Sequence, residues 1–385
     1  MLCNRKLILD TFCEVYDLLL PYADDKFWTF EDIEVQSGAI YVIGRAQFNL
    51  NVAKIREIIK HKQAIIILSN PAEGSETLKH HVQRLELVDE AIDGSLLLLG
   101  GGDMESHYCY MQYDSFLPKV YDYTENIEET NRIEEIYQKL DKPYKFLFLN
   151  GRTRPHRKFL IKSLELEGLL DTALWTNLDT SQGITKNIQL VKDGINYLAD
   201  TIPIKTLPIE YEVSRYQTNV ANLNTDEKFV KSKLFAYDDK LEWGDIYIRA
   251  ELYIDTYFSI VTDTIFTYPY SFRTEKIWKP IAMGHPWIAV SNYGYYKDLR
   301  NLGFKTYHSI IDESFDLIRN DQDRLNTIKH VIIDLCKSDL INFLSQCKEV
   351  SLYNQQHLYI MRDKVRKEFP GRFIDFLRKF GVGNG

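Results

Sequence analysis

The segment 271–292 constrains this 385-residue chain more than any other part of it. Thr274 is a favourable helix N-cap and the pair Glu275–Lys276 follows it, so a helix is predicted to begin there. Apolar residues then recur at helical spacing and define a buried face: Ile277, Trp278, Ile281 and Ala282. Gly284 ends the predicted helix, and the apolar run 287–290 is typical of a buried strand.

The start of this predicted helix is suited to binding an anion, because its free backbone N–H groups and the helix dipole both favour negative charge. A nucleoside diphosphate could bind to the acidic and the basic side chain at this helix start. Lys276 would meet a phosphate, and the carboxylate of Glu275 would accept hydrogen bonds from the ribose hydroxyls. The simpler interpretation is a capped helix that carries a Glu-Lys pair on its surface.

The same segment resembles the donor-binding segment of GT-B glycosyltransferases, most closely that of the alpha-1,3-fucosyltransferase family. In that family the helix is preceded by an aromatic residue, two further residues and the pair Glu-Lys. It is followed by a small residue, Gly, any residue, Pro and then an apolar run. The matching positions here are Phe272, Glu275, Lys276, Ala282, Gly284 and Pro286. The resemblance covers roughly residues 144–315. It implies that Glu275 holds the donor ribose, that Lys276 holds the diphosphate and that Phe272 lies near the base or the ribose.

Length, charge and cysteine content set limits on the class of protein. A chain of 385 residues is expected to form two domains. The net charge of −8 disfavours nonspecific binding to DNA or to an anionic membrane. Five cysteines without a Cys-x-x-Cys pair argue against a zinc site or a disulfide framework and favour a reducing compartment. No apolar run reaches the roughly 20 residues that span a bilayer, so we expect a cytoplasmic protein without a transmembrane segment.

Residues 1–141 predict an N-terminal Rossmann-like domain for the acceptor. Apolar runs predict parallel strands at 39–44, 63–68 and 95–99, with a helix capped by Asn49 and another capped by Ser75 between them. In an open parallel sheet, ligands bind at the carboxyl ends of the strands. The candidate catalytic bases are therefore Glu73 and Asp103, with Glu105 and His107 in the same region. The alternative for Glu73 is an acid that merely favours the start of a helix.

Residues 142–350 predict the Rossmann-like domain that binds the nucleotide-sugar donor. Its first strand begins at Tyr144 and leads into a turn with three arginines, which suit a diphosphate: Arg152, Arg154 and Arg157. Arg152 is the nearest match to the phosphate-binding arginine of the resembling family, and a solvated basic turn is the alternative. Strands are predicted at 257–262 and 305–307, whereas the segment 172–245 shows no clear pattern.

The chain is predicted to be helical from about Leu317 to Lys379, with breaks near Ser338 and Pro370. Residues 351–385 form the last helices of this prediction. In GT-B proteins a final helix often returns across the cleft to the first domain, and the resemblance implies the same for these residues. The predicted fold is thus α/β, with two Rossmann-like domains facing a cleft and a helical C-terminal segment.

The leading interpretation is a glycosyltransferase that moves a sugar from a nucleotide-diphosphate sugar to an acceptor hydroxyl of a glycan or another molecule. The resemblance implies inversion at the sugar carbon. The pairs Asp24–Asp25 and Asp238–Asp239 are adjacent and lack the Asp-x-Asp spacing of the metal-dependent class, so we expect a metal-independent reaction and no cofactor besides the donor. Two alternatives stay open. One is a phage-type enzyme that glycosylates a hydroxymethylated DNA base, which the net charge disfavours. The other is a nucleotide-sugar-binding protein without catalysis. A dehydrogenase is disfavoured because no G-x-G-x-x-G fingerprint is present.

Overall fold

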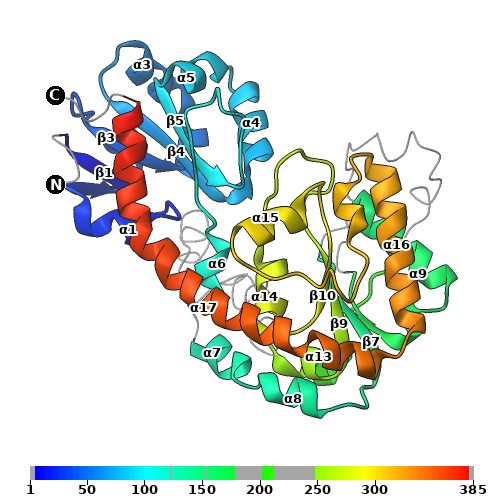
Figure 1. Ribbon diagram of the computed structural model, residues 1–385. Coiled ribbons are helices and arrows are strands. Elements are labelled where there is room, and N and C mark those ends of the chain that lie inside the picture. Colours follow the sequence, from blue (N-terminus) through cyan, green and yellow to red (C-terminus); the bar gives the residue numbers. More distant parts are fainter. Residues whose placement is uncertain (1–4, 122–123, 152–153, 178–201, 212–247, 381–385) are drawn as a thin grey trace. The chain divides into compact units, whose positions relative to one another are not determined.

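The computed structural model describes residues 5–121, 124–151, 154–177, 202–211 and 248–380. They form an α/β protein with two parallel sheets in separate domains and a long C-terminal helix, α17 (Leu340–Lys379) (Figure 1). Of the described residues, those up to 118 and those from 362 onward form one compact unit, and those between 119 and 361 form the other. The predicted fold class, with one Rossmann-like sheet in each domain, is confirmed.

The first unit contains six parallel strands in the order β2-β1-β3-β4-β5-β6. The strands are β1 (Leu7–Asp10), β2 (Asp25–Phe27), β3 (Ile40–Gly44), β4 (Ile65–Gly74), β5 (Leu96–Gly101) and β6 (Tyr110–Gln112). From β1 the chain first adds β2 on one side, and then crosses to add β3 and the later strands on the other side. The topological switch point of this sheet therefore lies between β1 and β3, where ligands of open α/β sheets bind.

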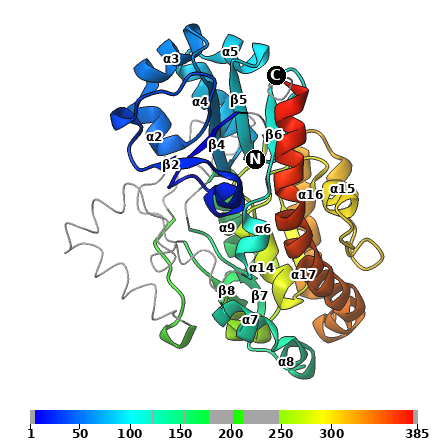
Figure 2. The ribbon, with the colours of Figure 1, turned by 90° about the vertical axis from the view of Figure 1, so that its left-hand side faces the viewer.

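Alternate residues of these strands enter two separate apolar cores, because both faces of the sheet are covered. Ile66 and Leu68 of β4 pack on the face covered by α2 (Arg45–Leu50), α3 (Val52–Lys60), α4 (Ser75–Arg84) and α5 (Val88–Asp93). Ile67 packs on the opposite face with α1 (Tyr16–Leu19) and with Phe369 and Phe373 of α17. Figures 1 and 2 show α17 and the α3–α5 group on opposite sides of this sheet.

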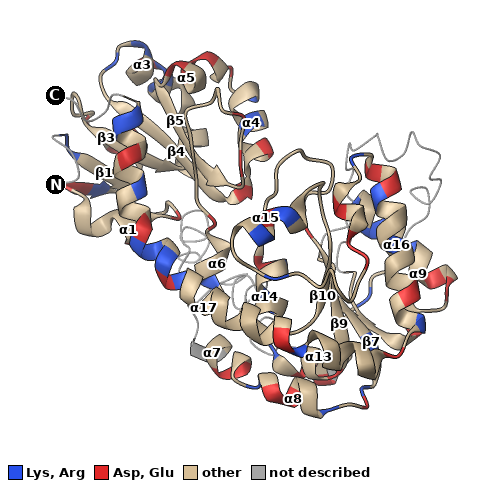
Figure 3. Ribbon diagram, in the orientation of Figure 1, with Lys and Arg blue, Asp and Glu red and all other residues tan. Residues whose placement is uncertain are grey.

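The second unit contains four parallel strands in the order β10-β9-β7-β8. The strands are β7 (Tyr144–Phe148), β8 (Ala173–Trp175), β9 (Thr256–Thr262) and β10 (Trp287–Val290). Helix α9 (Pro155–Leu166) connects β7 to β8, and α14 (Glu275–Met283) connects β9 to β10. The two connections lead to opposite sides, so the switch point lies between β7 and β9. Charged residues gather on helices and loops, whereas β5, β9 and β10 carry none (Figure 3).

Six further α-helices lie in the described residues. They are α6 (Phe116–Lys119), α7 (Thr124–Thr130), α8 (Ile133–Gln138), α13 (Ala250–Ile254), α15 (Tyr295–Asn301) and α16 (Asp321–Lys337). Gly284 ends α14 with a φ of 62°, as predicted, and a Cβ at this position would overlap Ile133 of α8. In the described ranges, no helix is long and apolar enough to cross a membrane.

Several predicted boundaries are wrong. Asn49 lies inside α2, and α3 begins only after Asn51, whose side-chain amide donates to the carbonyl of Gln47 at 2.8 Å. The predicted break near Ser338 is confirmed, but α17 continues through Pro370, because buried phenylalanines on both sides of it hold the helix against the first sheet. No strand forms at 305–307, where the chain is irregular.

Two strands of the first sheet extend further than predicted. Strand β4 continues from the predicted end at Leu68 to Gly74, with an irregular register between Asn70 and Gly74. Gly74 is the N-cap of α4 and no side chain caps this helix, so the predicted capping role of Ser75 is wrong. Strand β5 continues to Gly101. At Gly100 a Cβ would lie 3.0 Å from Leu78 and 3.1 Å from Tyr110, so the absence of a side chain lets these residues approach the strand closely.

Candidate functional site

The carboxyl ends of β7 and β9 meet the N-termini of α9 and α14 at the switch point of the second sheet. Helix α14 begins at Glu275, and the hydroxyl of its N-cap Thr274 accepts a hydrogen bond from the backbone N–H of Lys276 at 3.4 Å. The predicted cap, helix start and following strand are confirmed, and the predicted apolar face of α14 is buried. These residues are Ile277, Trp278, Ile281 and Ala282.

Glu275 and Lys276 form an ion pair at this helix start. The side chain of Glu275 is 8% exposed and that of Lys276 is 25% exposed, so the ammonium group is the more accessible of the two. Burial raises the pKa of Glu275, but the charge and hydrogen bond of Lys276, together with Lys279 and a backbone hydrogen bond, bring it below the ordinary value. A buried carboxylate that stays ionised is a suitable acceptor for two hydroxyl groups.

Asp263, the first residue after β9, holds this helix start in place. One oxygen of its carboxylate accepts hydrogen bonds from the Thr274 hydroxyl at 2.8 Å and from the Thr264 N–H at 2.9 Å, and the other accepts from the Tyr295 hydroxyl at 2.6 Å. Asp263 is fully buried, and burial raises its pKa although the charge of Lys276 opposes this. Asp263 therefore positions the N-cap and was not among the residues predicted from the sequence.

The predicted basic turn has a different role at each arginine. Arg157 is buried and donates to the carbonyl oxygens of Thr262 and Asp263 at 2.9 and 3.2 Å, and His156 contacts the same Asp263 carbonyl at 3.0 Å. These two side chains attach the first turn of α9 to the end of β9. Arg152, the preferred phosphate ligand, lies outside the described residues.

Arg154 is the N-cap residue of α9 and is partly buried. Its Nε–H is enclosed and has no hydrogen-bond partner within the described part of the chain. An enclosed guanidinium donor without a partner is uncommon, since most such groups are satisfied by protein, water or a ligand. Of the two described arginines of this turn, Arg154 is the better candidate for an anion, because the guanidinium of Arg157 already donates to two backbone carbonyls and is chiefly structural.

Phe272, the aromatic residue of the matched pattern, is 4% exposed. Its neighbours in the loop before α14 are also fixed: the Ser271 hydroxyl donates to the carboxylate of Asp298 and accepts from the amide of Asn292. Arg324 of α16 donates to the carbonyls of Phe266 and Ser291, which anchors the earlier part of the same loop. Glu275 and Lys276 thus follow a loop that side-chain hydrogen bonds hold in place.

The candidate bases of the first unit occupy the carboxyl side of its sheet, but in separate environments. Glu73 lies at the end of β4 with its side chain 42% exposed, and it forms an ion pair of 3.4 Å with Arg45. Asp103 is exposed after β5. Glu105 is paired with Lys79 at 2.5 Å. Burial raises its pKa, but the hydrogen bond and charge of Lys79, a backbone hydrogen bond and the nearby His107 together bring the pKa below its ordinary value.

Asp10 is a buried acid that the sequence analysis did not single out. It ends β1 at the switch point of the first sheet, where its carboxylate accepts the backbone N–H of Phe12 at 3.0 Å and that of Gly44 at 2.9 Å. Burial raises its pKa to about 6 despite these two hydrogen bonds. An acid that directly follows the apolar run Leu-Ile-Leu was the available signal, and Asp263 follows β9 in the same way.

Two further polar side chains at the end of β4 are enclosed and unpaired. Ser69 is fully buried and Asn70 is 4% exposed. The Ser69 hydroxyl and the Asn70 amide nitrogen have no hydrogen-bond partner in the described structure. Polar groups of this kind mark the carboxyl end of the first sheet as a place for water or a polar ligand.

Comparison of this chain with protein-family models, with curated proteins and with solved structures finds no match. The fold and the local geometry therefore define the class, an α/β protein with two Rossmann-like parallel sheets, and the function is inferred from the site itself.

Proposed function

We propose that the protein is a metal-independent glycosyltransferase that uses a nucleotide-diphosphate sugar as donor. One observation carries the proposal: an ionised, buried Glu275 and an accessible Lys276 begin a capped helix beside the switch point of a parallel sheet. This is where open α/β sheets bind nucleotides, and helix N-termini bind their phosphates.

The proposed roles follow from charge and accessibility. Lys276 and the enclosed guanidinium of Arg154 meet the diphosphate, together with the N-termini of α14 and α9. Glu275 accepts the ribose hydroxyls. When the bond between the sugar and the diphosphate breaks, negative charge grows on the leaving phosphate. Cations and backbone N–H groups that are already in place stabilise that charge without rearrangement.

The acceptor hydroxyl loses its proton during the transfer, and we assign this step to Glu73, with Asp103 as the alternative. Both side chains are accessible at the carboxyl side of the first sheet. Glu73→Gln is expected to keep nucleotide binding and to lose about 10²–10⁴-fold in transfer rate. An active Glu73→Gln enzyme together with an inactive Asp103→Asn enzyme would reverse the assignment.

Nucleotide binding is the first test. Thermal shift with UDP, GDP, CMP, ADP and dTDP and with their sugars identifies the nucleotide, since a ligand at 100 times its dissociation constant stabilises by about 2.7 kcal/mol. Calorimetry then compares Lys276→Ala with Lys297→Ala, a change of an exposed lysine on α15. We expect a loss of about 1.5–3 kcal/mol for the former alone.

Two results would overturn the proposal at different levels. No binding of any nucleotide, or equal affinity of the two lysine variants, would remove the donor site. Binding without release of nucleotide in the presence of glycan acceptors would instead favour a nucleotide-sugar-binding protein without catalysis.

A further inference from the structure

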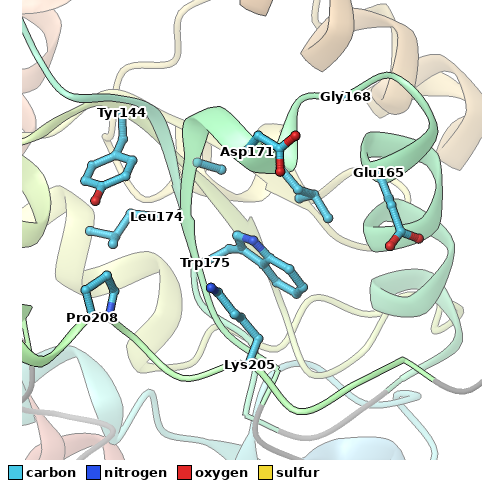
Figure 4. Close-up of a pocket in the computed structure, with 10 residues that line it drawn as sticks. Tyr144, Glu165, Gly168, Asp171, Leu174, Trp175, Lys205 and Pro208 are labelled. Carbon is cyan, nitrogen blue, oxygen red and sulfur yellow. The ribbon is translucent and has the colours of Figure 1, made fainter.

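A pocket of about 380 Å³ lies beside β8, the edge strand of the second sheet (Figure 4). It follows that edge from Gly168 to Trp175, and the segment from Lys205 to Pro208 forms its other wall. The volume lies in the usual range of small-molecule sites. None of the residues proposed to bind the nucleotide lines it, so it is a separate site.

The wall formed by residues 202–211 is attached to the body of the second unit. Lys205 and Asn177 exchange two backbone hydrogen bonds, at 2.8 and 2.9 Å, and this pairing continues the edge of the sheet. The hydroxyl of Tyr211 donates to the carboxylate of Asp255 at 2.6 Å. The pocket is therefore part of the folded unit.

The lining of the pocket combines one indole ring with several charged groups. Figure 4 shows the indole of Trp175 between Asp171 on one side and Lys205 on the other, with Glu165 further along the wall. Asp171 and Lys205 are exposed, and Trp175 is partly exposed. Glu165 is already engaged in an ion pair with Lys162 at 2.9 Å. Among the described lining residues, the carboxylate of Asp171, the ammonium group of Lys205 and the hydroxyl of Tyr144 thus remain as polar groups beside the indole.

This combination selects among ligand classes. The charges of Asp171 and Lys205 are opposite and Glu165 is paired with Lys162, so the lining offers no excess positive charge for a phosphate-bearing ligand. Lys205 in turn disfavours a compact cation, and the polar walls disfavour a purely apolar molecule. A neutral sugar satisfies all three features. Its hydroxyls donate to Asp171 and accept from Lys205, while its C–H face packs on the indole.

We infer that this pocket binds a neutral saccharide, with Trp175 as the stacking platform and with Asp171 and Lys205 as the hydrogen-bonding groups. The assignment is independent of the proposed nucleotide site. It gives the second unit a place to hold a glycan chain apart from the reacting groups.

The test measures binding of lactose, maltose and N,N′-diacetylchitobiose to the full chain by saturation-transfer NMR and by tryptophan fluorescence. We expect at least one disaccharide to bind with a dissociation constant on the order of 1 mM. Trp175→Ala should weaken this binding at least tenfold, and Asp171→Asn should weaken it several-fold. Trp28→Ala, which removes a 63% exposed indole in the first unit, should leave it unchanged.

Three results would refute the inference. They are no binding of any of the three disaccharides, binding that persists in Trp175→Ala, and Trp175-dependent binding of UDP or putrescine in place of a sugar. Far-UV circular dichroism and Trp175→Phe, which keeps an aromatic face, separate loss of the site from loss of folding. Lys276→Ala should not alter disaccharide binding, so failure of the proposed nucleotide site and failure of this inference are distinguishable.

Discussion

Replacing Asp263 by Ala tests whether this buried carboxylate organises the start of α14. The change removes the acceptor of three hydrogen bonds, two from the hydroxyls of Thr274 and Tyr295 and one from the Thr264 N–H. Both hydroxyl-bearing residues are at most 2% exposed, so water does not replace the lost acceptor. Each buried donor left without a partner costs about 1–3 kcal/mol.

The total cost of these three unpaired donors is reduced, because the buried carboxylate of Asp263 is itself unfavourable in its charged form, as its raised pKa indicates. We therefore expect Asp263→Ala to lower the free energy of unfolding by about 3–5 kcal/mol, in the range found when one partner of a buried charged network is removed. Tyr295→Phe removes a single bond to a charged acceptor and should cost about 1.5–3 kcal/mol.

Urea denaturation of the full chain, followed by circular dichroism, measures these differences. Asp171→Ala is the matched control, because it removes an exposed aspartate of the same unit and should change stability by less than about 0.5 kcal/mol. If Asp263→Ala lost less than about 1 kcal/mol, the carboxylate would not be organising the helix start, and the reasoning would fail.

Three further predictions concern Glu275, Gly284 and Asp10. Glu275→Gln should lower nucleotide affinity by about 1.5–3 kcal/mol in calorimetry; a melting shift with unchanged affinity would indicate a merely structural acid. Gly284→Ala should lower the free energy of unfolding in urea by about 2–4 kcal/mol, because φ is 62° and the new Cβ would overlap Ile133. Gly38→Ala is the control: its φ is 75° but the space around it is open, so it should cost only about 1–2 kcal/mol. Burial raises the pKa of Asp10 from 3.8 to about 6, so its contribution to the free energy of unfolding is greatest below pH 4 and about 3 kcal/mol smaller above pH 6. This pH dependence should be absent from Asp10→Asn. Identical profiles of unfolding free energy against pH for the two proteins would contradict the prediction.

The segment around α14 was predictable because its signals are local. A capping threonine, an apolar face at helical spacing and a glycine in the left-handed region each depend on a few neighbouring residues. Element boundaries that depend on contacts with distant parts of the chain were not predictable from the sequence. Pro370 reads as a helix break, yet Phe369 and Phe373 pack on the first sheet and carry the helix through it.

The residues of the candidate site show the same difference between local signals, which could be predicted, and distant contacts, which could not. Glu275 and Lys276 were predicted as neighbours at a helix start, because residues adjacent in sequence stay together. Asp263 and Arg157 act through contacts across many residues, such as the 106-residue separation between Arg157 and Asp263, which no local pattern reveals. Arg157 therefore read as a phosphate ligand, although its side chain holds the end of β9.

The sequence by itself determined the α/β class, the two Rossmann-like sheets and the helix that begins at Glu275, because apolar periodicity and capping are properties of short segments. Only the tertiary structure established the strand order, since both sheets are built from parallel strands whose neighbours are distant in the chain. That order places the switch points at Asp10 and Asp263. It also creates the pocket at the edge strand β8, whose walls come from separate segments that the chain brings together only on folding.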